Sequence, residues 1–210
     1  MITELGLIAV GSYLLGAIPT GYLLARLKRI DVRSTGSGNI GATNVARSAG
    51  KTLGLLTLLL DAAKGALPVL VVESFDWGLR ASPDLSQLAP LVAGCAALVG
   101  HCFPVTLGFR GGKGVATALG ALAVLAPLTL PVSLGVFAAV FAAFRRVSLA
   151  SITAAVSAPA AASWTGYAPP VVACICLMAV LIVYRHNENI SRLLAGTEPR
   201  FGKRDPSSSA

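Results

Sequence analysis

Apolar stretches near the length of a bilayer crossing constrain this chain more than any other feature. A helix rises about 1.5 Å per residue, so about 20 apolar residues cross a hydrocarbon layer roughly 30 Å thick. With 55% hydrophobic and only 12% charged residues among 210, the chain lacks the charge that covers a soluble domain. We therefore predict an all-α, polytopic integral membrane protein.

Seven spans are predicted, at residues 3–25, 53–72, 85–99, 115–126, 128–144, 149–164 and 169–184. If the pair around Pro127 re-enters the membrane from one side, six result. With the N-terminus outside and the C-terminus cytoplasmic, every Lys and Arg except Arg80 and Lys64 falls in a cytoplasmic segment. Charges at span ends also favour an anionic lipid surface over nucleic acid as the reason for the net charge of +8.

Residues 1–200 are expected to form a single membrane-embedded domain, followed by a polar tail at 201–210 without order. The chain opens with acidic Glu4 and no small-residue cleavage pattern, so the first span is expected to stay in place rather than act as a signal peptide. The cysteines form no CxxC pair and have no histidine at zinc spacing, and carboxylates are scarce near the loops. No metal is therefore predicted.

The junction at residues 34–44 is a candidate anion site. It interleaves glycines with Ser, Thr and Asn and leads to Arg47. Glycines let backbone N–H groups approach an anion, and hydroxyls with a guanidinium complete a phosphate cradle. A flexible connector is the alternative, but it needs no such density of donors. The spacing Gly36-x-Gly38-x-x-Gly41 matches a dinucleotide fingerprint, which we reject because that motif requires a preceding strand.

A second candidate, Gly111-Gly112-Lys113-Gly114, precedes an apolar segment and is typical of a phosphate-binding loop that opens a helix. It is not a Walker A motif, because Leu107 and Gly114 stand where that motif has Gly and Ser or Thr. A plain membrane-surface anchor is the alternative for Lys113.

Two further pairs of polar residues are each three positions apart. Asp61 and Lys64 lie within a span, where charge is expensive, so they are expected to pair with each other or with loop residues. A structural and a catalytic role both remain open for this pair. His186 and Asn189 follow the last span, and for His186 interfacial packing and substrate contact are both open.

Together, five separated motifs resemble the PlsY family of bacterial acyl-phosphate:glycerol-3-phosphate acyltransferases. They follow the order of the family over nearly the whole chain. The motifs are Ser37-Gly38-Asn39-Ile40-Gly41-Ala42-Thr43-Asn44 with Arg47; Asp61-x-x-Lys64-Gly65; Gly100-His101-x-Phe103-Pro104 leading to Gly111-Gly112-Lys113-Gly114-Val115-Ala116-Thr117; Ser148-Leu149-Ala150-Ser151-Ile152; and Arg185-His186-x-x-Asn189-Ile190.

The resemblance implies a seven-helix fold in the bacterial cytoplasmic (inner) membrane with an active site facing the cytoplasm. The substrates would be acyl phosphate and glycerol 3-phosphate, and the products lysophosphatidic acid and inorganic phosphate, in the first step of phospholipid synthesis. A functional link to the enzyme that supplies acyl phosphate is expected, and neither a cofactor nor nucleic acid is. Ala17, Arg110 and Asn187 depart from the residues common in the family, and only Asn187 removes a charge near the site.

The resemblance also implies a role for each site residue. Catalytic roles fall to Ser37, Arg47, Lys113, Ser148, His186 and Asn189. Substrate phosphate binding falls to Gly38, Asn39, Gly41, Thr43, Asn44, Gly111, Gly112 and Gly114, and supporting roles to Asp61, Lys64, His101, Thr117 and Arg145.

No nucleophile motif is visible in the sequence. There is no GxSxG elbow, and neither histidine is followed by Asp at the fifth position, so the HxxxxD dyad of other glycerolipid acyltransferases is absent. We therefore expect no acyl-enzyme. A transporter for a phosphorylated solute and a scaffold for lipid-synthesis partners are the competing function classes.

Overall fold

Helices make up the regular structure of this chain, for which the computed structural model describes residues 2–75, 77 and 82–202. No strand occurs among those residues, which confirms the predicted all-α class. The elements are α1 (Ile2–Gly16), α2 (Thr20–Arg26), α3 (Ala42–Ser48), α4 (Lys51–Ser74), α5 (Pro83–Cys102), the short 3-10 helix η1 (Val105–Leu107), α6 (Val115–Leu125), α7 (Thr129–Phe144), α8 (Val147–Trp164), α9 (Pro169–Arg185) and α10 (Asn187–Leu194).

Within the described residues, four helical stretches are long and apolar enough to cross a membrane. They are Ile2–Arg26, Lys51–Ser74, Pro83–Leu107 and Val147–Trp164. The pair Pro169–Arg185 and Asn187–Leu194 makes a fifth if its 61° bend lies within one span. Helices α6 and α7 are apolar but shorter. Each predicted span thus corresponds to helical structure, while the count of seven and the orientation stay predictions.

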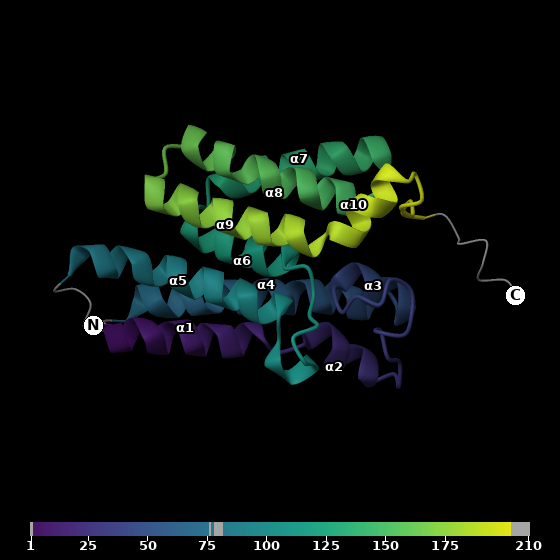
Figure 1. The fold of residues 1–210 in the computed structure, drawn as a ribbon, viewed down its shortest axis with the longest axis horizontal. Helices are drawn as coiled ribbons and strands as arrows, with labels where there is room; N and C mark the ends of the chain where they lie inside the picture. The colour runs from purple at the N-terminus through teal and green to yellow at the C-terminus, as the bar shows by residue number, and fades with distance from the viewer. Residues whose placement is uncertain (1, 76, 78–81, 203–210) are drawn as a thin grey trace, which may run out of the picture.

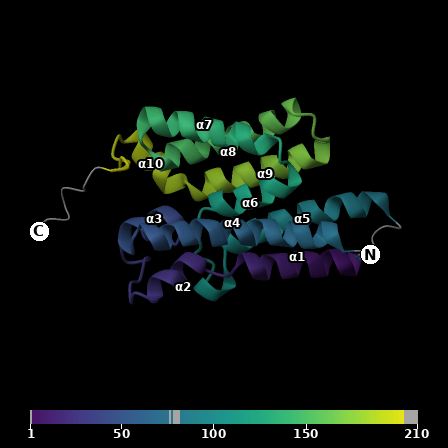
Figure 2. The ribbon, with the colours of Figure 1, turned by 180° about the vertical axis from the view of Figure 1, so that it is seen from behind.

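The helices form two groups with α6 between them (Figures 1 and 2). Helices α1, α4 and α5 lie on one side of α6, and α7, α8 and α9 lie on the other. An apolar cluster that includes Val69, Leu98, Leu125 and Met178 joins α4, α5, α6 and α9. Leucines such as Leu59 are exposed on the outer faces, as expected for helices that contact lipid.

Glycines bring two helix pairs together at backbone distance. A Cβ added at Gly65 or Gly120 would overlap a backbone carbonyl of the partner helix, at Thr117 and Ala62 respectively, so α4 and α6 meet without intervening side chains. Gly16 and Gly100 do the same for α1 and α5. Small residues at such positions allow helices to associate closely within a membrane.

Short helical segments divide regions that the sequence analysis treated as continuous. The first predicted span breaks before Pro19, because proline has no N–H for a helical hydrogen bond, and α2 begins at Thr20. Helix α3 begins at the end of the polar segment 34–44, which we call the first junction, and α10 follows a bend at His186. These segments lie at the end of the bundle away from the N-terminus (Figure 1).

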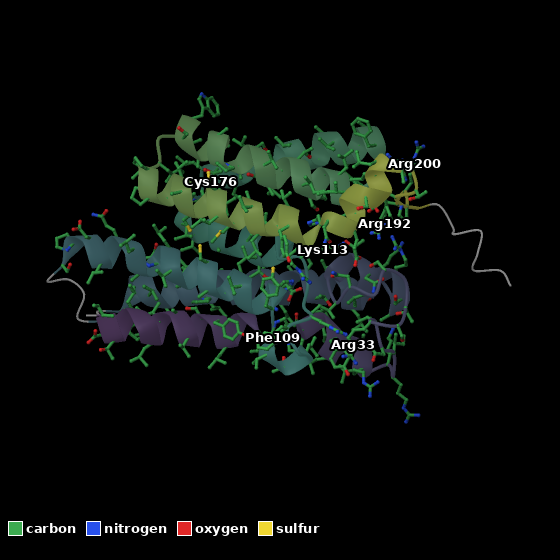
Figure 3. The ribbon with its side chains drawn as sticks, viewed as in Figure 1. Arg33, Phe109, Lys113, Cys176, Arg192 and Arg200 are labelled. Atoms are coloured by element: carbon green, nitrogen blue, oxygen red, sulfur yellow. The ribbon has the colours of Figure 1, made fainter. Side chains whose placement is uncertain are left out.

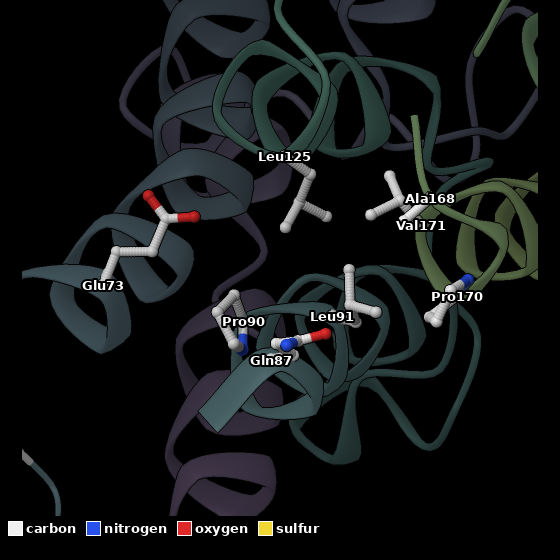
Figure 4. Close-up of a pocket in the computed structure, with 8 residues that line it drawn as sticks. All are labelled: Glu73, Gln87, Pro90, Leu91, Leu125, Ala168, Pro170 and Val171. Carbon is white, nitrogen blue, oxygen red and sulfur yellow. The ribbon is translucent and has the colours of Figure 1, made fainter. Parts of the chain in front are cut away.

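The polar junctions that follow α2, α5, α7 and α9 all lie in the half of the bundle away from the N-terminus, which we call the polar end. A pocket lies at the opposite end, lined by the side chains drawn in Figure 4: Glu73, Gln87, Pro90, Leu91, Leu125, Ala168, Pro170 and Val171. It contains none of the predicted site residues.

Arg80 and residues 203–210 of the predicted tail lie outside the described residues. Phe201, at the start of that tail, packs edge-on against Phe141, with ring centroids 5.6 Å apart.

Candidate active site

The loop of Gly111, Gly112, Lys113 and Gly114 is held from two sides. From α5, the carbonyl oxygens of Cys102 and His101 accept hydrogen bonds from the backbone N–H groups of Gly111 (3.2 Å) and Gly112 (3.0 Å). From α9, the guanidinium of Arg185 donates to the carbonyls of the same two glycines, at 2.8 and 3.0 Å. The loop is therefore fixed, and it presents Lys113 just before α6 begins.

Glycine is required at three points of this loop, and a Cβ at Gly111 would overlap the carbonyl oxygen of His101. A Cβ at Gly112 would overlap the imidazole of the buried His101. Gly114, which caps the N-terminus of α6, has φ of 81°, a left-handed conformation that glycine adopts without strain. The glycines of this loop thus serve close packing and a turn in the backbone.

A chain of hydrogen bonds connects Lys113 to two other predicted catalytic residues. The Lys113 ammonium donates to Oδ1 of Asn189, and Nδ2 of Asn189 donates to the Glu198 carboxylate at 2.7 Å. The hydroxyl of Ser148 donates to the same carboxylate oxygen at 2.5 Å. Nε of Arg192 donates to the other Glu198 oxygen at 2.7 Å. The structure therefore brings Lys113, Ser148 and Asn189 together around Glu198.

Glu198 reaches this position because the chain reverses after α10. Gly196 has φ of 72°, and the N–H groups of Thr197 and Glu198 donate to the carbonyl of Arg192, at 2.8 and 3.1 Å. Farther along, the N–H of Phe201 donates to the carbonyl of Arg145 at 2.7 Å. Together with the bond from Ser148 to Glu198, this fastens the segment after α10 to the junction between α7 and α8.

Charge and burial shift the pKa of two groups in this cluster. Burial, reinforced by the nearby guanidinium of Arg192, lowers the pKa of Lys113 to about 8. Figure 3 places Lys113 and Arg192 near the bend between α9 and α10. For Glu198, burial favours the neutral acid, but hydrogen bonds from Ser148, Asn189 and Arg192 outweigh it and lower the pKa of the carboxyl.

His186 lies at the bend between α9 and α10 and is buried. Its Nδ1 lies 2.7 Å from the carbonyl oxygen of Ile182. Because a carbonyl only accepts, this hydrogen bond requires the proton on Nδ1. In the neutral ring, Nε2 then carries a lone pair that can accept a hydrogen bond.

The first polar junction is organised around one amide side chain. Asn44, which is buried in α3, accepts a hydrogen bond from the N–H of Ser37 at 2.9 Å. Its Nδ2 donates to the carbonyls of Val32, Thr35 and Asn39, at 2.9, 3.1 and 2.8 Å. A role for Asn44 in phosphate binding would therefore run through the loop that it shapes. Arg47 lies in the last turn of α3.

Beneath these loops lies a buried ionic cluster. The Lys64 ammonium is 2.9 Å from the Asp61 carboxylate, and Nδ1 of His101 is 3.5 Å from the same carboxylate oxygen. The predicted pairing of Asp61 with Lys64 is therefore present. The hydroxyl of Thr117 is buried and has no hydrogen-bond partner among the described residues.

The predicted residues thus form three groups: one around Glu198, one on the first junction, and the buried cluster of Asp61, Lys64 and His101 beneath them. Within the described part of the chain, no hydrogen bond or ion pair joins Ser37 or Arg47 directly to Lys113. Sequence reasoning missed Glu198, Arg185 and Arg192 as members of the site. For Glu198 the signal was the Gly-x-Glu turn after a short polar helix, which many surface turns share, and Arg185 stood in the last motif without an assigned role. No three His, Cys, Asp or Glu side chains in residues 2–75, 77 and 82–202 gather as a metal site would require.

A family model described as glycerol-3-phosphate acyltransferase matches residues 6–196. The chain belongs to the glycerol-3-phosphate acyltransferase family. The glycerol-3-phosphate acyltransferase of Syntrophotalea carbinolica is 46% identical to it over 200 residues, which cover 95% of this chain and 98% of the relative. That of Jannaschia sp. is 49% identical over 201 residues, which cover 95% and 94%.

Two solved structures of PlsY (YgiH), an integral membrane glycerol 3-phosphate acyltransferase, have the same fold. The glycerol 3-phosphate form aligns with a TM-score of 0.85 at 42% identity, covering 94% of this chain and 96% of that one. The lysophosphatidic acid form aligns with a TM-score of 0.83 at 42% identity, covering 94% and 95%. The resemblance to PlsY that the motifs indicated is therefore confirmed for this glycerol-3-phosphate acyltransferase family member.

Proposed function

We propose that this member of the glycerol-3-phosphate acyltransferase family uses acyl phosphate as its donor. It transfers the acyl group to the 1-hydroxyl of sn-glycerol 3-phosphate and releases lysophosphatidic acid and inorganic phosphate. The reaction takes place at the polar end, which faces the cytoplasm in a bacterial inner membrane. The observation that carries the proposal is the cluster of Lys113, Asn189, Ser148 and Arg192 around Glu198, with His186 at the adjoining bend.

This cluster suits a reaction that depends on positioning. An acyl phosphate is a mixed anhydride with a good leaving group, so the enzyme mainly has to hold two phosphate dianions and stabilise developing charge. Lys113, Arg192 and the donors of the first junction supply that charge and those hydrogen bonds. Arg47 adds a guanidinium suited to bidentate phosphate binding.

The proposed step is direct. The 1-hydroxyl oxygen attacks the acyl carbon, the bond from that carbon to the phosphate oxygen breaks, and the hydroxyl proton goes to a phosphate oxygen. In the bound complex, Nε2 of His186 accepts a hydrogen bond from the hydroxyl and orients it, since Nδ1 is held by Ile182; as the new bond to carbon forms, this same proton passes to the phosphate oxygen. The ammonium of Lys113 stabilises the negative charge that develops on the acyl oxygen.

No acyl-enzyme is proposed, although Ser148 donates a hydrogen bond to a carboxylate. A general base is effective when its pKa lies near the working pH. The pKa of Glu198 is lowered instead, so this carboxylate is a poor base for a serine hydroxyl. Glu198 is better suited to holding Ser148 and Asn189 in place.

The test is a donor comparison with purified protein. Glycerol 3-phosphate is supplied with acyl phosphate or with acyl-CoA, and lysophosphatidic acid and phosphate are measured. We expect turnover with acyl phosphate alone and equal amounts of the two products. Turnover with acyl-CoA alone would contradict the proposed donor. Uptake of glycerol 3-phosphate into liposomes without acyl transfer would favour a transporter instead.

A further inference from the structure

The buried cluster beneath the two polar junctions contains a carboxylate that is hydrogen-bonded to Thr20, ion-paired with Lys64 and 3.5 Å from Nδ1 of His101, side chains of three different helices. Asp61 of α4 accepts a hydrogen bond from the Thr20 hydroxyl at the start of α2. Its other neighbours are Lys64 of the same helix at 2.9 Å and His101 at the end of α5 at 3.5 Å. Asp61, Lys64 and His101 are 2%, 4% and 3% exposed, so none is accessible to a substrate at the surface.

Each partner of Asp61 leads to a different part of the site. Thr20 opens α2, whose Gly21 packs so closely on the carbonyl of Ile40 that a Cβ there would overlap it. Ile40 belongs to the first junction. On the other side, the His101 ring lies against Gly112, and its carbonyl holds the Gly112 N–H at 3.0 Å.

Lys64 adds a third connection, to the break between α1 and α2. Its ammonium donates to the carbonyl of Ile18 at 2.7 Å. A break in a membrane helix frees backbone carbonyls that need a partner, and Lys64 supplies one. The ion pair therefore fixes the place where α2 leaves α1, and with it the direction from which the first junction reaches the site.

We propose that Asp61 is a positioning residue that sets the spacing between the two halves of the substrate site. One half is the junction at 34–44, reached through Thr20 and α2, and the other is the loop at 111–114, reached through His101. A purely structural ion pair would need only Lys64. The additional partners connect Asp61 to both proposed phosphate-binding segments, and in the part of the chain that the structure describes no hydrogen bond or ion pair joins Ser37 or Arg47 to Lys113. This inference rests on the proposed function.

Glycerol 3-phosphate is the substrate that should respond. It has no apolar part, so its affinity depends on donors from the two loops, whereas an acyl phosphate is also anchored in lipid by its chain. Misplacement of binding groups by about 1 Å costs on the order of 100-fold in rate. Loss of one of the three Asp61 partners should displace α2 by less, and we expect about a tenfold effect.

The variant that tests this is Thr20→Val, which removes the hydroxyl and keeps the shape. Thr57→Val is the matched control, because Thr57 is buried beside Gly21 but, among the described residues, its hydroxyl donates only to the carbonyl of Leu53 in its own helix, at 2.7 Å. We expect Thr20→Val to raise the KM for glycerol 3-phosphate about tenfold, with kcat and the KM for acyl phosphate changed less than about twofold. Thr57→Val should leave all three within about twofold of the wild type.

Asp61→Asn is the second variant and should raise the same KM further, with thermal unfolding followed in parallel. If Asp61→Asn does not fold, Thr20→Val decides the question. A Thr20→Val protein with a lowered unfolding temperature and an unchanged KM for glycerol 3-phosphate would overturn the inference, as would equal effects in Thr20→Val and Thr57→Val. Absence of acyl-phosphate turnover in the wild type would instead contradict the proposed function.

Discussion

Replacing Glu198 should cost stability and activity together, because one carboxylate holds three side chains of the site. Glu198 is 8% exposed and accepts hydrogen bonds from Ser148, Asn189 and Arg192. Glu198→Ala removes all three bonds. Glu198→Gln keeps an oxygen for Ser148 and Asn189 but turns an amide donor toward Arg192.

The magnitude follows from these contacts. Hydrogen bonds to a charged group contribute about 1.5–3 kcal/mol each, but bonds to a shared carboxylate are not additive. The Arg192 side chain is 35% exposed, so its share is reduced by solvent. We expect Glu198→Ala to lower the free energy of unfolding by about 3 kcal/mol, and Glu198→Gln by about half of that. For a chain of this size, these losses correspond to roughly 6–12 °C and 3–6 °C in Tm.

The assay combines thermal unfolding in detergent with turnover of glycerol 3-phosphate and acyl phosphate. In the alanine variant, Ser148 and Asn189 lose their anchor, and kcat/KM should fall by about 100-fold. Glu188→Gln is the control, because Glu188 is exposed on α10, the helix that precedes the Glu198 turn, and the charge change is the same. Since the pKa of Glu198 is lowered from 4.5, its stabilising effect is complete above that value and disappears as the pH falls through the lowered pKa. A Glu198→Ala protein with the Tm and kcat/KM of the Glu188→Gln control would refute this reasoning.

Three more predictions concern the two polar junctions. Lys113→Met should lower kcat/KM about 100-fold. Because burial lowers the pKa of Lys113 to about 8, wild-type kcat/KM should fall as the pH rises through that value, and Lys113→Arg should move this decrease to higher pH. If Lys113→Arg leaves the pH–rate profile unchanged, the decrease belongs to another group. Gly112→Ala places a Cβ in the His101 ring, so kcat/KM should drop by about 10–100-fold as the loop shifts, whereas Gly135→Ala, where a Cβ meets no atom within 4 Å, should leave kinetics unchanged. Asn44→Ala removes four hydrogen bonds that shape the first junction, so it should weaken binding of glycerol 3-phosphate about tenfold in calorimetry. Unchanged binding would indicate that the junction is a plain connector.

The helices were predictable because apolar length and Gly or Pro punctuation are local signals. Predicted spans such as 53–72 and 149–164 lie inside the observed Lys51–Ser74 and Val147–Trp164. The break before α2 was missed because a single proline, Pro19, interrupts an otherwise apolar run that reads as one span. Such a break becomes favourable only when another element supplies a partner, and here Lys64 binds the Ile18 carbonyl from α4.

The candidate site was predictable in part for a similar reason. Glycine-rich loops with Lys113 or Arg47 predict phosphate binding from local composition, and the structure brings Lys113 together with Ser148 and Asn189. Glu198 was not foreseeable, because its importance arises from a turn at Gly196 that returns it to side chains on α8 and α10. Arg185 was part of a predicted motif, but its role was not foreseeable, because it depends on the path of a loop more than 70 residues earlier, at Gly111 and Gly112.

The contacts at Gly65 and Gly120 have a consequence for the protein in membranes of different thickness. Where two helices touch through their backbones, no rotamer change can alter their separation or allow one to slide along the other. Helices α4 and α6 should therefore respond to a thinner or thicker bilayer by tilting as one body. The geometry of the polar end would then be insulated from lipid composition, and only its depth in the membrane would change.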